Sequence, residues 1–141
     1  MFYGGLHMYK LLIADDEVTI RTSLASFFPW EKEGFEVVGT CADGKEVIQF
    51  ITENRVDVIL IDIRMPHVTG IDVAQYIFEN KMKIKVVLLS AHGEFTYAQA
   101  SMRYGVQYYV LKPTKYEELS QVFSELHAQL DIENEVSIRN N

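Results

Sequence analysis

The sequence of 141 residues contains a single cysteine, Cys41, so no disulfide bond can form within the chain. It also lacks any apolar run near the roughly 20 residues that a membrane-spanning helix requires. Residues 1–7 have neither the basic start nor the long apolar stretch of a secretory signal. Together these absences favour a protein that stays in the cytoplasm, where cysteine remains reduced, and they predict no association with a membrane.

Basic residues are also in short supply. The chain carries 13 Lys and Arg against 20 Asp and Glu, a formal net charge of −7, and its basic residues are scattered. Proteins that bind the phosphate backbone of nucleic acids usually carry a basic patch. We therefore expect no direct contact between this segment and DNA.

Short apolar stretches alternate with segments of helical periodicity along the chain. Such alternation is typical of repeated βαβ units with a parallel sheet covered on both faces. The expected strands are 9–14, 35–40, 56–61, 85–90 and 106–111, and the expected helices are 18–28, 44–54, 70–80, 95–104 and 115–136. The pattern predicts an α/β fold, a flavodoxin-like (βα)5 doubly wound parallel sheet with strand order 2-1-3-4-5.

Polar residues stand at the carboxyl ends of these predicted strands. They are Asp15 and Asp16 after the first, Asp62 after the third, Ser90 at the end of the fourth and Lys112 after the fifth. Each residue alone is more often a helix cap, a loop residue or a turn residue. In the predicted strand order the first and third strands are neighbours at the switch point, where such folds bind ligands. The joint placement therefore favours a single functional site.

The residue types in this site indicate phosphoryl chemistry. Three neighbouring carboxylates repel one another unless a cation or a proton is bound, and oxygen ligands select a hard cation such as Mg²⁺. The Lys112 ammonium would screen Asp62 from an incoming phosphoryl group and would stabilise its oxygens. We expect Asp62 to attack phosphorus in line and Ser90 to hydrogen-bond the resulting acyl phosphate.

Four motifs carry a resemblance to a known family. In order they are LLIADDE (11–17), IDIRMP (61–66), LLSA (88–91) and YVLKP (109–113). With these motifs the chain resembles the receiver domain of two-component response regulators over about residues 8–130. Pro29-Trp30-Glu31 and Phe95-Thr96-Tyr97-Ala98 are similar to receivers of AraC-type (YesN-like) transcriptional regulators.

The resemblance implies a role for each residue of the site. Asp62 would accept a phosphoryl group from a sensor histidine kinase, and Lys112 would be the counter-ion of the phosphate. Ser90 and Tyr109 would form a switch pair, and the bond before Pro113 is a candidate for the cis form. The implied ligands of Mg²⁺ are Asp15, Asp16, Asp62 and the backbone carbonyl of Arg64.

The resemblance also implies an organisation of the chain. Residues 1–7 are expected to be a leader, 8–132 the receiver domain, and 133–141 the start of a linker to an output domain absent from this sequence. The expected partners are the histidine kinase and, on phosphorylation, a second copy of the chain, with DNA bound only through the output domain. Such a chain is a signalling domain that controls transcription, with only self-phosphotransfer and autodephosphorylation as activities.

Three other functions fit parts of the pattern. A haloacid-dehalogenase-like phosphohydrolase requires a second Asp two residues after the nucleophile, and Arg64 at that position argues strongly against it. A mononucleotide-binding module requires a phosphate loop after the first strand, and the acidic run Asp15-Asp16-Glu17 at that position argues against it. A degenerate receiver that acts as a docking module without phosphotransfer stays open.

Two histidines lie in the predicted loops. His67 is expected to be exposed, and His92 with Arg64 is expected to affect how water reaches the acyl phosphate.

Overall fold

The main sheet has five parallel strands: β3 (Tyr9–Ala14), β4 (Phe35–Cys41), β5 (Val58–Asp62), β6 (Lys85–Ser90) and β7 (Tyr108–Leu111). The computed structural model describes residues 2–3, 5–91 and 93–139, without the side chains of residues 2, 3, 95 and 136–139. The strands lie in the order β4-β3-β5-β6-β7. The predicted order 2-1-3-4-5 is therefore confirmed, and β3 and β5 are neighbours.

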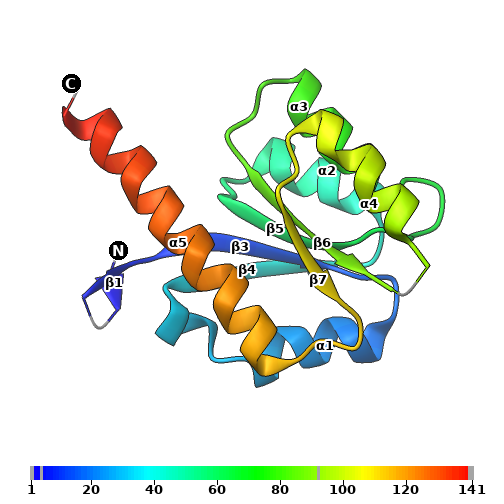
Figure 1. The fold of residues 1–141 in the computed structure, drawn as a ribbon, viewed down its shortest axis with the longest axis horizontal. Coiled ribbons are helices and arrows are strands. Elements are labelled where there is room, and N and C mark those ends of the chain that lie inside the picture. Colours follow the sequence, from blue (N-terminus) through cyan, green and yellow to red (C-terminus); the bar gives the residue numbers. More distant parts are fainter. Residues whose placement is uncertain (1, 4, 92, 140–141) are drawn as a thin grey trace.

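Helices cover both faces of this sheet (Figure 1). One face carries α1 (Val18–Phe27) and α5 (Tyr116–Arg139), and the other carries α2 (Gly44–Glu53), α3 (Gly70–Glu79) and α4 (Phe95–Ser101). Successive residues of a strand point to opposite faces, so Leu11 packs in one layer and Leu12 in the other. Two buried cores therefore hold the strands from either side and fix where their carboxyl ends meet.

Two short helical turns were not predicted. The first, η1 (Trp30–Glu33), follows α1 because the Trp30 indole NH donates to the Leu24 carbonyl at 2.7 Å while its ring packs against Phe123. The second, η2 (Met102–Tyr104), ends the predicted helix 95–104 as a tighter turn. The predicted helix thus divides into α4 and η2, and α4 is short.

The predicted strand limits were wrong at two positions. β5 begins at Val58 rather than at residue 56, although the Asp57 backbone is already bonded on both sides: its NH donates to the Lys10 carbonyl at 2.9 Å and its carbonyl accepts from the Lys85 NH at 3.0 Å. β7 begins at Tyr108 rather than at residue 106. Both strands still end where the sequence predicts to within one residue, so the placement of the polar residues after them is unaffected.

The N-terminal strands pack against the middle of α5. Strands β1 (Phe2–Tyr3) and β2 (Leu6–His7) pair antiparallel, and the carbonyl of His7 lies 2.8 Å from Nε2 of His127 on α5.

The predicted boundary between residues 132 and 133 falls within α5, which continues to Arg139 and extends past the sheet (Figure 1). The division of the chain into leader, domain and linker stays a prediction. Among the described helices, none combines the length and hydropathy of a membrane span.

Candidate functional site

Three carboxylates meet at the carboxyl ends of the two central strands. Asp62 is the last residue of β5, and Asp15 follows β3, its neighbour in the sheet. One oxygen from each of Asp15, Asp16 and Asp62 lies within 4.8 Å of the others. Asp15 and Asp62 are buried, whereas Asp16 is exposed to solvent. The structure thus brings the three predicted acids together at the switch point of the sheet.

Lys112 joins the two buried carboxylates. Its Nζ lies 2.9 Å from Oδ2 of Asp15 and 3.0 Å from Oδ2 of Asp62. Its backbone NH donates to the Ser90 carbonyl at 2.8 Å, and the Lys112–Pro113 bond is cis. Burial by itself lowers the pKa of Lys112, but the two carboxylates outweigh this effect and the pKa is raised. The lysine therefore carries a full positive charge between Asp15 and Asp62.

The pKa of Asp62 lies closer to neutral pH than that of an ordinary aspartate. The pKa of Asp62 is raised from 3.8 to about 6, mainly by burial and to a smaller extent by the negative charge of Asp15. The hydrogen bond and charge of Lys112 act in the opposite direction, as does the backbone NH of Arg64, which lies 3.3 Å from Oδ1 of Asp62. A bound cation would favour the ionised form of this carboxylate.

The oxygen atoms of the cluster suit a hard cation. Oδ1 of Asp15 accepts a hydrogen bond from the Glu17 NH at 2.9 Å. Oδ2 of Asp15 is buried and has no hydrogen-bond partner in the described part of the chain; its contact with Lys112 is an ion pair without hydrogen-bond geometry. An octahedral Mg²⁺ sphere places its ligand oxygens about 3 to 4 Å apart, close to the spacing of these three acids.

Ser90 and Tyr109 lie on the neighbouring strands β6 and β7. The Ser90 side chain is buried, and its hydroxyl makes a long contact, 3.3 Å, to the Ala91 carbonyl. The Tyr109 hydroxyl lies 3.0 Å from the Val106 carbonyl, 3.3 Å from the Ala98 carbonyl and 3.2 Å from Oγ of Ser101. Tyr109 thus contacts the C-terminal end of α4, while the Ser90 hydroxyl has a weak partner that it can exchange.

The Arg64 side chain forms a second group of contacts, which the sequence did not predict. Its Nε lies 3.1 Å from Oε2 of Glu94, and its Nη2 donates to the Tyr97 hydroxyl at 3.1 Å, with the guanidinium 4.8 Å from the ring centre. Glu94 is buried, and its Oε1 accepts a hydrogen bond from the Ala91 NH at 2.6 Å. No spacing in the sequence signals these contacts, because they join two loops 30 residues apart.

The two loop histidines that the sequence singled out differ in what the structure shows. His67 is exposed, as predicted. His92 lies outside the described residues.

A pocket of about 640 Å³ opens beside the acidic cluster, lined by Asp16, Arg64 and Tyr97 among others. Its lining includes Asp16 of the three clustered acids but neither Asp62 nor Lys112.

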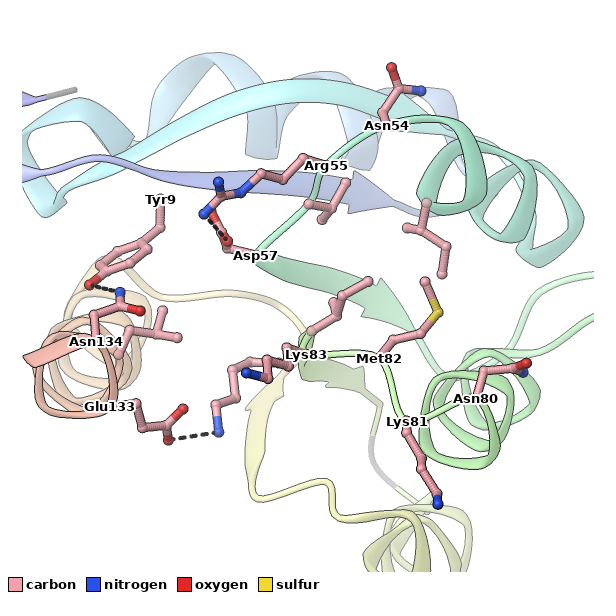
Figure 2. A pocket seen from close by; sticks show the side chains of 15 residues that line it. Tyr9, Asn54, Arg55, Asp57, Asn80, Lys81, Met82, Lys83, Glu133 and Asn134 are labelled. Atoms are coloured by element: carbon pink, nitrogen blue, oxygen red, sulfur yellow. Dashed lines mark hydrogen bonds and ion pairs between the residues drawn. The ribbon is translucent and has the colours of Figure 1, made fainter. Parts of the chain in front are cut away.

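A different pocket, of about 720 Å³, lies at the opposite end of the sheet (Figure 2). Four of its charged groups form two pairs, Arg55 with Asp57 at 3.7 Å and Lys85 with Glu133 at 3.0 Å, and Lys81 and Lys83 also line it. The paired side chains neutralise each other locally, and among the described residues its acids do not converge as Asp15, Asp16 and Asp62 do. We therefore place the candidate site at the acidic cluster and not in this pocket.

Comparison with known proteins agrees with this geometry. The family model described as the response regulator receiver domain matches residues 11–124, most of the chain. The chain belongs to this receiver family. The receiver is 32% identical over 123 residues to the transcriptional regulatory protein YesN of Bacillus subtilis, covering 87% of this chain and 33% of YesN. It is 32% identical over 119 residues to the transcriptional regulatory protein HptR of Staphylococcus aureus, covering 84% of this chain and 46% of HptR.

Solved structures of other receivers share the fold. The receiver domain of AraT, a response regulator from Geobacillus stearothermophilus, has a TM-score of 0.83 and 33% identity, covering 89% of this chain and 98% of that one. A two-component transcriptional regulator AraC from Clostridium phytofermentans has a TM-score of 0.80 and 25% identity, covering 90% and 98%. The receiver described here is a signalling domain and not a conventional enzyme, and it spans less than half the length of YesN and HptR.

Proposed function

We propose that this receiver accepts a phosphoryl group on Asp62 from a sensor histidine kinase, in a reaction that depends on Mg²⁺. The observation that carries the proposal is the contact of one lysine, Lys112, with two buried carboxylates, Asp15 and Asp62, beside the exposed Asp16. A purely structural ion pair would need one acid for one base. The excess of negative charge leaves room for a cation.

In the proposed transfer, a carboxylate oxygen of Asp62 attacks phosphorus and forms a new O–P bond. The P–N bond to the phosphohistidine of the kinase breaks, and its electron pair leaves with the imidazole. Lys112 balances the charge on the transferring oxygens, because its ammonium already lies 3.0 Å from Asp62. The later attack of water on the acyl phosphate would return Asp62 to its free form.

Asp15, Asp16, Asp62 and the backbone carbonyl of Arg64 are the groups that would hold Mg²⁺. When bound, the cation supplies positive charge that offsets the repulsion among the carboxylates and the incoming phosphoryl group. Oδ2 of Asp15, which is ion-paired with Lys112 but has no hydrogen-bond partner in the described part of the chain, and the exposure of Asp16 support this role.

The proposed consequence of phosphorylation is a change at α4, β7 and α5. The phosphoryl group adds roughly 1.5 to 2 negative charges and strong acceptors. The Ser90 hydroxyl would leave its weak contact with Ala91 to donate to the phosphate, and Tyr109 on the next strand would move with it. This change would alter a surface for a partner or for a second copy of the chain.

The proposed output of this change is control of transcription. The relatives YesN and HptR are named as transcriptional regulatory proteins and are more than twice as long as the segment they share with this chain. Contact with DNA is therefore proposed only for an output domain outside this sequence, in keeping with the net charge of −7.

Intact-mass measurement tests the proposal. The protein is incubated with acetyl phosphate, from which acetate leaves as the P–O bond breaks, with Mg²⁺ or with a chelator, beside the variant Asp62→Ala. One phosphoryl adduct that requires both Mg²⁺ and Asp62 is the expected result. Folded protein that binds Mg²⁺ and forms no adduct with acetyl phosphate or with a histidine kinase would contradict it and would favour a docking module.

A further inference from the structure

The buried carboxylate of Glu94 binds donors from the two loops that follow β5 and β6. Oε1 accepts the backbone NH of Ala91 at 2.6 Å, and Oε2 pairs with the Arg64 guanidinium at 3.1 Å. Only 7% of Glu94 is exposed. A hydrogen bond to an ionised carboxylate at this distance is among the stronger ones in proteins.

Both donors belong to the segments that flank Asp62. Ala91 directly follows Ser90, the last residue of β6, and Arg64 stands two residues after Asp62. The strands β5 and β6 are paired with Asp62 opposite Leu89, so the two loops leave the sheet side by side. A phosphoryl group on Asp62 would bring three acceptor oxygens to the place where these loops diverge.

We propose that the Glu94 carboxylate occupies the position of a phosphoryl oxygen, so that it must leave the Ala91 NH before the phosphorylated state can form. The inference rests on the proposed phosphorylation of Asp62. Glu94 is thus a positioning residue that acts through Ala91 and restrains phosphorylation. A site that is open for only a fraction of the time reacts in proportion to that fraction.

The same contacts link the site to α4. Glu94 is the N-cap residue of α4, and its carbonyl accepts the Ala98 NH at 3.0 Å, although its side chain makes no capping bond. Tyr97, in the first turn, holds the Arg64 guanidinium. Release of Glu94 from Ala91 would therefore loosen Arg64 and the first turn of α4 together.

The test compares initial rates of phosphorylation by acetyl phosphate, with Mg²⁺, for the parent and Glu94→Gln. We expect the neutral side chain to raise the rate on the order of ten-fold. This factor corresponds to weakening one hydrogen bond to a charged acceptor. A side chain with only a structural role would lower the rate or leave it unchanged. A higher rate would show that Glu94 competes with the phosphoryl group, whereas a lower or unchanged rate would show that Glu94 has only a structural role.

Glu46→Gln is the matched control. Glu46 also accepts the NH of an alanine just after a strand, since its Oε1 lies 3.1 Å from the Ala42 NH, but on β4, away from Asp62. We expect this variant to be phosphorylated at the parent rate. Urea unfolding of both variants shows whether their stabilities change by similar amounts.

Arg64→Gln supplies a second measurement. If Arg64 acts by holding Glu94, its replacement raises the rate in the parent and has no further effect in Glu94→Gln. An equal rate for Glu94→Gln and Glu46→Gln, or a lower rate for Glu94→Gln, would overturn the inference while the adduct on the parent still supports the proposed function. Absence of an adduct on the parent with both acetyl phosphate and a histidine kinase would instead overturn the proposed function.

Discussion

Nζ of Lys112 lies 3.0 Å from Oδ2 of Asp62, although 50 residues separate them in sequence. The same nitrogen lies 2.9 Å from Oδ2 of Asp15. Lys112 is attached to the end of β7 and the acids to β3 and β5, so the contact requires the whole sheet to be in register. The lysine offsets the cost of burying two carboxylates and presents its charge where a phosphoryl group would arrive.

Replacing this lysine should separate metal binding from phosphorylation. In Lys112→Ala we expect phosphorylation by acetyl phosphate to slow on the order of 100-fold, the usual effect of removing one group that stabilises a transition state. Mg²⁺ should bind at least as tightly, because Lys112 no longer competes for the oxygens of Asp15 and Asp62. Intact mass and calorimetric titration measure the two effects.

The exposed Lys115 in the same loop provides the control, since Lys115→Ala should change neither measurement. Loss of Mg²⁺ binding in Lys112→Ala would contradict the expected competition between the lysine and the cation.

The pKa of Asp62 gives a pH dependence of defined sign. Burial, as the main cause, raises it from 3.8 to about 6, so the folded protein binds the proton more tightly than the unfolded chain. The resulting contribution to stability is complete below about pH 4 and is lost as the pH rises through 6. Without metal, Asp62→Asn should therefore gain stability over the parent between pH 4 and 6, by on the order of 2 kcal/mol.

Urea unfolding in a chelating buffer, repeated at several pH values, measures this difference. Mg²⁺ should diminish it near pH 7 by binding the ionised carboxylate of the parent. A difference between the two proteins that is constant from pH 4 to 7 would show that Asp62 titrates alike in the folded and unfolded states.

Asp16 should affect the metal and not the fold. It is exposed, whereas Asp15 is buried and ion-paired with Lys112. Asp16→Asn should leave the melting temperature without metal unchanged within about 1 °C, since exposed side chains away from special contacts contribute little. It should strongly reduce the rise in melting temperature that Mg²⁺ produces in the parent. Thermal scans with increasing Mg²⁺ test both parts, and an unchanged rise would exclude Asp16 as a ligand.

Gly70 keeps the start of α3 against the site. A Cβ at this position would lie 2.4 Å from the Asp62 carbonyl oxygen, a backbone atom that has little freedom to move. We expect Gly70→Ala to lower the free energy of unfolding by about 2 kcal/mol or more and to slow phosphorylation, because the Asp62 backbone must shift. Urea unfolding and the rate of adduct formation measure the two effects.

Gly105→Ala is the comparison. Gly105 has φ of 79° with its nearest neighbour at 3.9 Å, so the substitution adds backbone strain without a clash. It should lose stability but keep the parent rate of phosphorylation. Equal losses of rate in both variants would point to general loosening instead of a local shift at Asp62.

The hydroxyl groups of Ser90 and Tyr109 should matter for the switch more than for the chemistry. Ser90→Ala and Tyr109→Phe each remove one hydroxyl, and neither hydroxyl contacts Lys112 in the described contacts. Both variants should still form the adduct on Asp62. Size-exclusion chromatography should show that any association induced by phosphorylation of the parent is weakened in each, and an unchanged elution shift would contradict their pairing as a switch.

The sequence predicted the strand order and the convergence of Asp15, Asp16, Asp62 and Lys112, because parallel strands bring their carboxyl ends to one edge wherever their exact limits fall. The first residues of β5 and β7 were predicted two positions too early, because an apolar run indicates a strand without specifying where its ladder of hydrogen bonds begins.

The contacts of Arg64 depend instead on how two loops lie in space. The motif around Asp62 predicted a role for the Arg64 backbone, but nothing in it specifies that the side chain meets Glu94 and Tyr97. The Tyr109 hydroxyl was likewise unpredictable, since its partners belong to the end of α4 and to Val106. Contacts of this kind follow from tertiary packing and have no local periodicity.

The length of α5 has a mechanical consequence. The helix begins four residues after Lys112 and continues for 24 residues, so it spans about 36 Å. Its first half is anchored in the core by Phe123 and Leu126. Its second half is tied to the opposite end of the sheet, where Asp131 and Asn134 contact the Tyr9 hydroxyl and Glu133 pairs with Lys85. One continuous helix therefore joins the loop after Lys112 to the far end of the sheet, and a rearrangement around Asp62 that shifts the first turn of α5 would also have to shift or break these distant contacts.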